Sequence, residues 1–157
     1  MDLSDLLTLD AILPNLKASS KKQALQELSA RAAQITRLPE RDIFETLVQR
    51  ERQGSTGVGH GIAIPHTKMA PLNRLVGVFA RLDRAIDFEA VDDEPVDLLF
   101  LLLAPEGSGA DHLKALARIA RVLRDSTIAN KLRATTDPAA LYAVLTEPGL
   151  ASGGIQA

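Results

Sequence analysis

The sequence predicts a single α/β domain over residues 1–147, in which a mixed β-sheet is covered by helices on both faces as a three-layer sandwich. Segments of helical periodicity come before, between and after the apolar runs, which is typical of a sheet with two helical layers. Residues 96–103 (VDLLFLLL) are apolar enough to form a strand that is buried on both faces. A length of 157 residues, with 46% hydrophobic and 24% charged residues, suits one domain.

Two helices are predicted in the first half of the chain. Ser20 and a glutamine three residues later form a capping-box pattern, and apolar residues then recur at helical spacing, so we expect a helix from about Lys21 to Ile35. Pro39 opens a second helix, because proline is tolerated in a first helical turn and the acidic residues after it suit the positive end of the helix dipole. Gly54 ends this helix.

A glycine-rich stretch and a short strand follow. Residues 54–61 (GSTGVGHG) are expected to form a loop. The apolar residues 62–65 (IAIP) predict a short strand, which Pro65 terminates because proline has no N–H for the sheet ladder. His66 is therefore placed at the end of a strand.

Two longer strands and three helices complete the predicted domain. Residues 75–82 and 96–103 are rich in β-branched and large apolar residues, as central strands are. The segment between them is expected to hold turns and short extended pieces. An amphipathic helix follows Gly109, and Ser126 and Asp137 open two further short helices.

Composition and charge exclude several classes of protein. The chain has no cysteine, which rules out disulfides, thiolate nucleophiles and zinc or iron–sulfur sites with cysteine ligands. A net charge of -2 and 3% aromatic residues argue against nucleic-acid binding, which needs a basic surface and stacking platforms. The N-terminus lacks a signal-peptide pattern and the longest apolar run is too short for a membrane span, so we expect a cytoplasmic protein without membrane insertion. The tail, residues 148–157, has little to bury and is expected to be flexible.

The glycine-rich loop and the three histidines each allow a structural and a functional interpretation. The loop lacks the third glycine of a dinucleotide fingerprint, and a strand follows where a phosphate-binding loop needs a helix, so nucleotide binding is a weak hypothesis. His60, His66 and His112 offer the ligands of a zinc triad, but their spacing matches no metal motif, and we expect no metal or cofactor. His60, between glycines, is interpreted as a surface or satisfied core residue.

His66 is the strongest candidate for chemistry, because a strand end beside a glycine-rich loop holds its backbone in an accessible place. An imidazole titrates near neutral pH, so this ring can accept a phosphoryl group and pass it on. The transfer also needs donors that neutralise the phosphoryl oxygens, and Arg50 and His112 are the candidates. Their structural alternatives are a cation at a helix C-terminus for Arg50 and an exposed polar residue for His112.

The motif around His66 matches a known signature. Glu51, then Val58-Gly59, then the run from Ile62 to His66 occur in the order of that signature, and further matching stretches extend over nearly the whole chain: 20–25, Arg50-Glu51, 54–56, 95–100 and 112–119. The pattern closely resembles the type-2 IIA domains of the bacterial phosphoenolpyruvate-dependent phosphotransferase system, the mannitol/fructose-like IIA class.

The resemblance implies a fold and a set of roles. The fold is a mixed sheet sandwiched by helices, as in mannitol-specific IIA. The histidine of the Pro-His pair carries the phosphoryl group on its ε nitrogen, which assigns phosphorylation to His66. The arginine of the Arg-Glu pair contacts the group, which corresponds to Arg50, and the histidine of the later helix lies beside it, which corresponds to His112.

Within that family, the single-domain length, Lys21-Lys22 and residues 54–59 look most like the nitrogen branch. This branch implies a phosphotransferase component whose role is regulatory, an HPr-like phosphocarrier as donor, and target proteins in nitrogen metabolism and potassium transport or among sensor proteins. We expect a monomer or a weak dimer. A sugar-specific IIA that passes phosphate to a IIB, and a binding module that is never phosphorylated, are the alternatives.

Two residues depart from the family pattern. Thr67 stands where glycine, alanine or cysteine is usual, and His60 stands where asparagine is common. We expect the Thr67 hydroxyl to lie beside the reactive ring, where it can hydrogen-bond the phosphate or narrow access. His60 offers a further cation at low pH. Neither change removes a required group, so phosphorylation is expected to persist.

Overall fold

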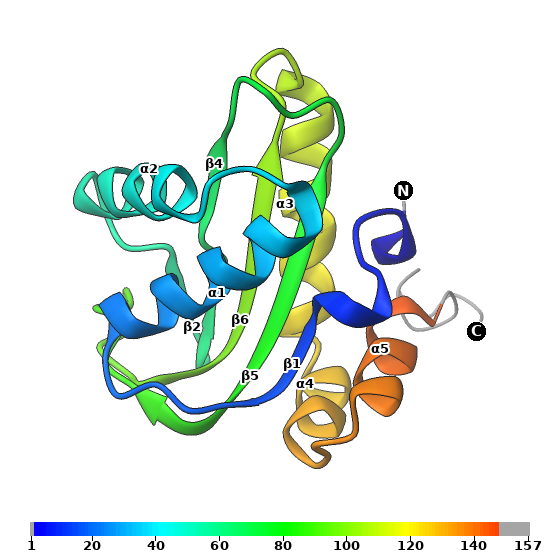
Figure 1. Cartoon of the computed structure of the whole chain (residues 1–157). Helices are drawn as coiled ribbons and strands as arrows, with labels where there is room; N and C mark the ends of the chain where they lie inside the picture. Colours follow the sequence, from blue (N-terminus) through cyan, green and yellow to red (C-terminus); the bar gives the residue numbers. More distant parts are fainter. Residues whose placement is uncertain (1, 148–157) are drawn as a thin grey trace.

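Strand β6 (Val96–Ala104) lies at the centre of a six-stranded mixed sheet in the computed structural model, which describes residues 2–147 (Figure 1). On one side β6 pairs antiparallel with β5 (Val76–Ile86), which in turn pairs parallel with β1 (Ile12–Leu16). On the other side β6 pairs parallel with two short strands in succession, β3 (Ile62–Ala63) and then β4 (His66–Lys68). The sheet therefore contains both parallel and antiparallel neighbours, as the sequence predicted.

Helices cover both faces of this sheet, and the side chains of β6 alternate between two hydrophobic cores. One core lies under α1 (Lys21–Thr36) and α2 (Glu40–Arg52), and it takes Leu99, Leu101 and Leu103 of β6. The other core takes the alternate residues Leu98, Phe100 and Leu102 and lies under α3 (Gly109–Arg124), α4 (Ser126–Arg133) and α5 (Pro138–Thr146). Figure 1 shows α3 behind β5 and β6, with α1 and α2 on the opposite side of the sheet. The three-layer sandwich is confirmed.

Local signals located the helices well. The Ser20 hydroxyl accepts a hydrogen bond from the Gln23 amide and begins α1 at Lys21, as the capping-box pattern predicts. Pro39 is the N-cap of α2, and this helix ends at Arg52, just before Gly54. Asp125 and Asp137 accept hydrogen bonds from the first turns of α4 and α5. All five predicted helices are present.

The strands differ from the prediction in four places. Residues 12–16 form β1, which the sequence did not identify because it contains a proline and an asparagine; an edge strand tolerates that proline. Residues 57–59, expected to be loop, form β2 (Gly57–Gly59), which pairs antiparallel with β3. Strand β5 extends to Ile86, into the segment expected to hold turns.

The fourth difference concerns His66, which begins a strand where the sequence predicted that it would end one. Pro65 does interrupt the ladder, as expected, but its carbonyl accepts a hydrogen bond from the Leu102 amide at 2.9 Å. The chain therefore stays alongside β6 and resumes pairing as β4.

Two 3-10 helices, η1 (Leu3–Asp5) and η2 (Leu9–Ala11), precede β1. The predicted flexible tail, residues 148–157, lies outside the described residues. Among the helices of the described part of the chain, none has the length and apolar character needed to cross a membrane.

Candidate functional site

The His66 side chain is half-buried at the start of β4, and one of its ring nitrogens is occupied. Nδ1 lies 2.8 Å from the carbonyl oxygen of Ile64. Because a carbonyl oxygen can only accept a hydrogen bond, Nδ1 must carry the proton in this contact. In the neutral ring, Nε2 then holds a free lone pair.

The His112 ring packs edge-on against the His66 ring. Their centroids are 5.6 Å apart and their planes are inclined by 65°. His112 lies in the first turn of α3 and is only 8% exposed, which excludes the exposed polar role considered for it. Among the residues that the structure describes, its buried Nε2 has no hydrogen-bond partner. A buried ring nitrogen that has no partner, next to the His66 ring, keeps its hydrogen-bonding capacity for a further group.

Arg50 lies in the last turn of α2, and this helix packs against β4. Its Nη1 donates a hydrogen bond to the Gly54 carbonyl oxygen at 2.9 Å, which fixes the guanidinium near the C-terminus of the helix. Its positive charge reaches the His66 ring, where it disfavours protonation. The fold thus brings together the three site residues selected from the sequence: His66, Arg50 and His112.

Burial and neighbouring charges favour the neutral form of both rings. The pKa of His66 is lowered from its ordinary value of 6.5, mainly by burial; the bond to Ile64 opposes this, and the charge of Arg50 adds to it. The pKa of His112 is also lowered, first by burial and then by the charges of His66 and Lys68. At neutral pH the neutral form of the His66 ring is therefore favoured, with its lone pair on Nε2.

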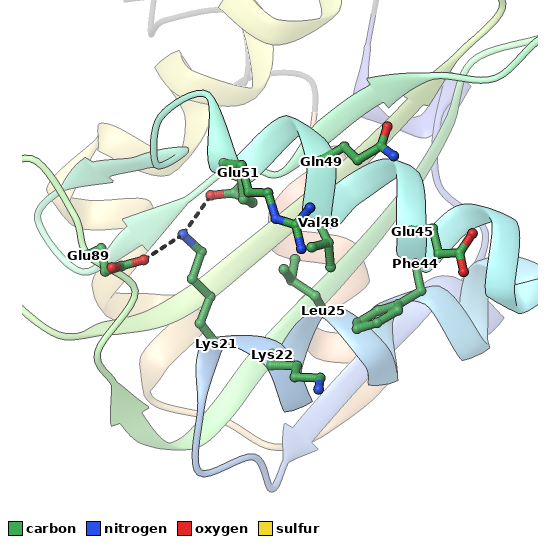
Figure 2. A pocket seen from close by; sticks show the side chains of 10 residues that line it. Lys21, Lys22, Leu25, Phe44, Glu45, Val48, Gln49, Glu51 and Glu89 are labelled. Atoms are coloured by element: carbon green, nitrogen blue, oxygen red, sulfur yellow. Dashed lines mark hydrogen bonds and ion pairs between the residues drawn. The ribbon is translucent and has the colours of Figure 1, made fainter.

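A second polar cluster lies next to this site, at one end of a groove between α1 and α2 (Figure 2). Its centre is Glu51, whose side chain is only 5% exposed and forms an ion pair with Lys21 at 2.9 Å. The groove has a volume of about 870 Å³, with an apolar floor and a charged rim, and its lining residues are Lys21, Lys22, Leu25, Phe44, Glu45, Val48, Gln49, Glu51, Arg52 and Glu89.

Sequence patterns did not reveal that Lys68 lies near His112 or that Lys21 and Glu51 form a buried ion pair. Glu51 and Lys21 appeared only as parts of the family motif, since nothing local marks a carboxylate in a polar stretch as buried. Lys68 could have been found from strand alternation, because residues two apart on a strand share a face. His66 and Lys68 therefore lie on one face of β4.

The same alternation corrects the expectation for Thr67. This residue pairs with Leu103, whose side chain belongs to the α1–α2 core, whereas His66 pairs with Leu102 of the α3 core. The Thr67 side chain therefore points to the opposite face from the His66 ring and is not placed to bond a phosphate there.

His60 is exposed and takes a backbone role. It has a φ of 58°, its amide donates to Asp92 Oδ2 at 3.1 Å, and its carbonyl accepts from Arg133 Nη2 at 2.9 Å. Histidine, like asparagine, is enriched among the residues that adopt such left-handed angles, which is consistent with His60 at this position. Within residues 2–147, no three His, Asp or Glu side chains are grouped so that they could hold a metal ion.

Comparison with known proteins gives consistent matches over nearly the whole chain. The family described as "Phosphoenolpyruvate-dependent sugar phosphotransferase system, EIIA 2" matches residues 5–147. A nitrogen regulatory protein of Bradyrhizobium diazoefficiens is 63% identical over 94% of this chain and 97% of its own length. The crystal structure of the nitrogen regulatory protein IIA-Ntr from Neisseria meningitidis superimposes with a TM-score of 0.87 at 33% identity, covering 92% of this chain and 99% of that one. The crystal structure of mannitol IIA from Escherichia coli shares the fold. It is 19% identical and superimposes with a TM-score of 0.77, covering 89% of this chain and 99% of that one.

Proposed function

The chain belongs to the EIIA 2 family of the phosphoenolpyruvate-dependent phosphotransferase system, and from this premise we propose that it is a phosphoryl carrier of the nitrogen branch that is phosphorylated on Nε2 of His66. The observation that carries the assignment is the bond between His66 Nδ1 and the Ile64 carbonyl. This bond favours the tautomer that carries its proton on Nδ1, which leaves the lone pair of Nε2 as the nucleophile.

In the proposed step, the Nε2 lone pair attacks the phosphorus of a phosphohistidine on an HPr-like phosphocarrier. A nitrogen–phosphorus bond forms at His66, the bond in the donor breaks, and its electron pair returns to the donor imidazole. The proton stays on His66 Nδ1 throughout, hydrogen-bonded to the Ile64 carbonyl. The ring that accepts the phosphoryl group gains positive character, which this hydrogen bond stabilises.

Arg50 and His112 stabilise the charge of the group in transfer. The guanidinium of Arg50 offers further N–H donors besides the one that binds Gly54, and their planar arrangement suits phosphoryl oxygens. The buried Nε2 of His112 has no partner among the described residues and can donate to an oxygen of the same group when it carries a proton. The acceptor is already a nucleophile and the donor bond is already activated, so the step is written without a metal.

The similarity to a nitrogen regulatory protein at 63% identity supports a regulatory outcome. In this proposal the phosphorylation state of His66 controls binding to target proteins in the cytoplasm, in nitrogen metabolism, potassium transport or sensing. A sugar-specific role, in which the phosphoryl group passes on to a IIB component, is the second candidate, because the family description names a sugar system.

Mass spectrometry tests the carrier function directly. The protein is incubated with phosphoenolpyruvate, the first enzyme of the system and an HPr-type carrier, and its mass is measured. We expect the gain of one phosphoryl group, no gain in His66→Ala, and an unchanged gain in His60→Ala, which removes an exposed histidine away from the site. A wild-type chain that gains nothing would contradict the proposal and favour a module that binds partners without phosphorylation.

Addition of a IIB component to the phosphorylated protein separates the two candidate outcomes. We expect the phosphoryl group to remain on His66 under conditions in which a sugar-specific IIA is dephosphorylated within the assay. Complete transfer to the IIB, and from it to fructose or mannitol, would replace the regulatory assignment with the transport one.

A further inference from the structure

Glu51 is a buried carboxylate with both oxygens fully engaged. Its Oε1 forms an ion pair with Lys21 Nζ at 2.9 Å and accepts a hydrogen bond from the Thr56 amide at 3.1 Å, and its Oε2 accepts a hydrogen bond from the Thr56 hydroxyl. Lys21 is held in turn, because its ammonium lies 4.8 Å from the centre of the Phe88 ring. It also lies 3.2 Å from the exposed Glu89 (Figure 2). An ion pair so placed is no better for stability than a well-packed apolar pair, so its directional bonds call for another explanation.

One set of bonds runs from Glu51 to the reactive histidine. Thr56, which Glu51 holds through its amide and its hydroxyl, accepts a hydrogen bond from the Ile64 amide at 3.0 Å on its own carbonyl oxygen. The Ile64 carbonyl then accepts from His66 Nδ1 at 2.8 Å. The position of Thr56 thus sets the acceptor that selects the His66 tautomer.

A second set of bonds runs from the same residue to the arginine. The Gly54 amide donates to the Glu51 backbone carbonyl at 3.1 Å, and the Gly54 carbonyl accepts from Arg50 Nη1 at 2.9 Å. Gly54 lies two residues before Thr56, within the turn that the Glu51 carboxylate closes. The Glu51 carboxylate thus supports the acceptor of His66 through Thr56, and it supports the acceptor of Arg50 only indirectly, by closing the turn of residues 51–56 that contains Gly54.

We propose that the buried Lys21–Glu51 ion pair is a positioning device that, through Thr56, orients the His66 ring and the Arg50 guanidinium for phosphoryl transfer. It touches none of the reacting atoms and acts only through other residues. This inference rests on the proposed phosphorylation of His66. The transfer is sensitive to such support because a small displacement of reacting groups slows a reaction strongly.

Thr56 offers a matched pair of variants. Thr56→Val keeps the shape of the side chain and removes the hydroxyl that Glu51 binds, while Thr56→Ser keeps the hydroxyl. Glu51→Ala removes the carboxylate and with it all of its contacts to Lys21 and Thr56. Glu89→Gln is the control, because it removes the exposed partner of Lys21 and leaves the Lys21–Glu51 bond intact.

Two measurements are made on each folded variant: the nitrogen-15 shifts of the His66 ring, which report the tautomer without any phosphorylation, and the rate of phosphoryl acceptance. We expect the wild type, Thr56→Ser and Glu89→Gln to keep Nδ1 protonated and to accept phosphate at equal rates. Thr56→Val and Glu51→Ala should show a mixture of tautomers and rates roughly 10- to 100-fold lower.

A double-mutant cycle that combines Glu51→Ala with Arg50→Ala distinguishes a positioning effect on Arg50 from a general loss of structure. If Glu51 acts through Arg50, the combined variant is slowed by less than the product of the two single effects. The inference is overturned if folded Thr56→Val and Glu51→Ala both show the wild-type tautomer of His66 and the wild-type rate of phosphoryl acceptance. If Glu51→Ala does not fold, the result for Thr56→Val decides. A wild-type protein that accepts no phosphate overturns the proposed function instead, and the ring shifts still decide whether Glu51 orients His66.

Discussion

The chemistry available to His66 depends on the single carbonyl group of Ile64. That carbonyl comes from the residue before Pro65, in the interruption between β3 and β4, and accepts from Nδ1 at 2.8 Å. Burial and the charge of Arg50 lower the pKa of the ring and so favour its neutral form at neutral pH. The Ile64 carbonyl therefore bears on the tautomer of His66 and the Arg50 charge on its pKa. The part played by Arg50 can be tested by substitution.

We expect Arg50→Ala to fold with an unfolding free energy within about 1 kcal/mol of the wild type, because the side chain is only half-buried and lies at a helix end. Its rate of phosphoryl acceptance should fall by about 10²- to 10³-fold, the loss typical of removing one donor to a developing charge. Urea denaturation and quenched transfer assays measure the two effects. Arg52→Ala, which removes a cation in the same turn, is the control, and an unchanged rate in Arg50→Ala would reduce Arg50 to a helix-end cation.

The two histidines should make stability depend on pH. Their pKa values are lowered in the folded protein, so between the folded pKa and 6.5 the unfolded chain binds more protons than the native one. The contribution of these two histidines to the unfolding free energy should therefore be fully present above pH 6.5. It should decrease as the pH drops below 6.5 and through the pKa values of the folded protein.

Urea denaturation at about pH 7.5 and about pH 5.5 measures this difference. The difference should shrink in a variant that carries both His66→Gln and His112→Gln, and it should persist in His60→Gln, whose ring is exposed. An identical pH dependence in the double variant would show that other groups are responsible.

At the scale of elements, the hairpin that joins β2 and β3 depends on unusual backbone angles. Its two connecting residues, His60 and Gly61, have φ values of 58° and 77°. Positive φ at both central residues is the pattern of a type I′ turn, whose twist matches that of the strands and which favours Asn-Gly. The hairpin positions β3 against β6 and so leads the chain into the segment that ends at His66.

Gly61→Ala should destabilise the protein by about 1 to 3 kcal/mol, the usual cost of a strained backbone position. An added Cβ would also lie 2.6 Å from Arg133 Nη2 and 3.0 Å from Asp97 Oδ1, an ion pair that joins α4 to β6. Thermal or chemical denaturation gives the loss. Gly107→Ala is the matched control, since an added Cβ there meets no atom within 4 Å, and an equal effect of both substitutions would contradict this account.

At the scale of the whole molecule, β6 joins the two helical layers, because its side chains pack against the helices on both faces of the sheet. Its side chains enter both cores, and the residues from Leu98 to Leu103 have no exposed surface. The strand also carries β3 and β4 along one side, which sets the position of His66 relative to the start of α3 and the end of α2.

Leu98→Ala and Leu101→Ala should each lower the unfolding free energy by about 2 to 5 kcal/mol, because each leaves a cavity in a different core. Denaturant titrations of the two variants measure this. Leu113→Ala, at a position 68% exposed, should change it by less than about 0.5 kcal/mol. A small effect at either β6 position would mean that one face of the sheet is not a packed core.

Much of this fold could be predicted from local patterns. Ser20, Ser126, Asp137 and the regular spacing of apolar residues act within a few residues of chain, and they located the helices. The continuous apolar run of β6 identified a strand that is buried on both faces. The β1 strand and the β2–β3 hairpin could not be found in this way, because their pairing depends on partners far along the chain.

The sequence by itself determined the helices, the central strand, the exclusion of thiol chemistry, and the selection of His66, Arg50 and His112 as the residues to examine. Only the tertiary structure decided which nitrogen of His66 is free, that Thr67 faces away from it, and that Glu51 is buried beside Thr56. The first group depends on composition and short-range periodicity. The second depends on desolvation and on hydrogen bonds between segments distant in sequence, which exist only once the layers are packed.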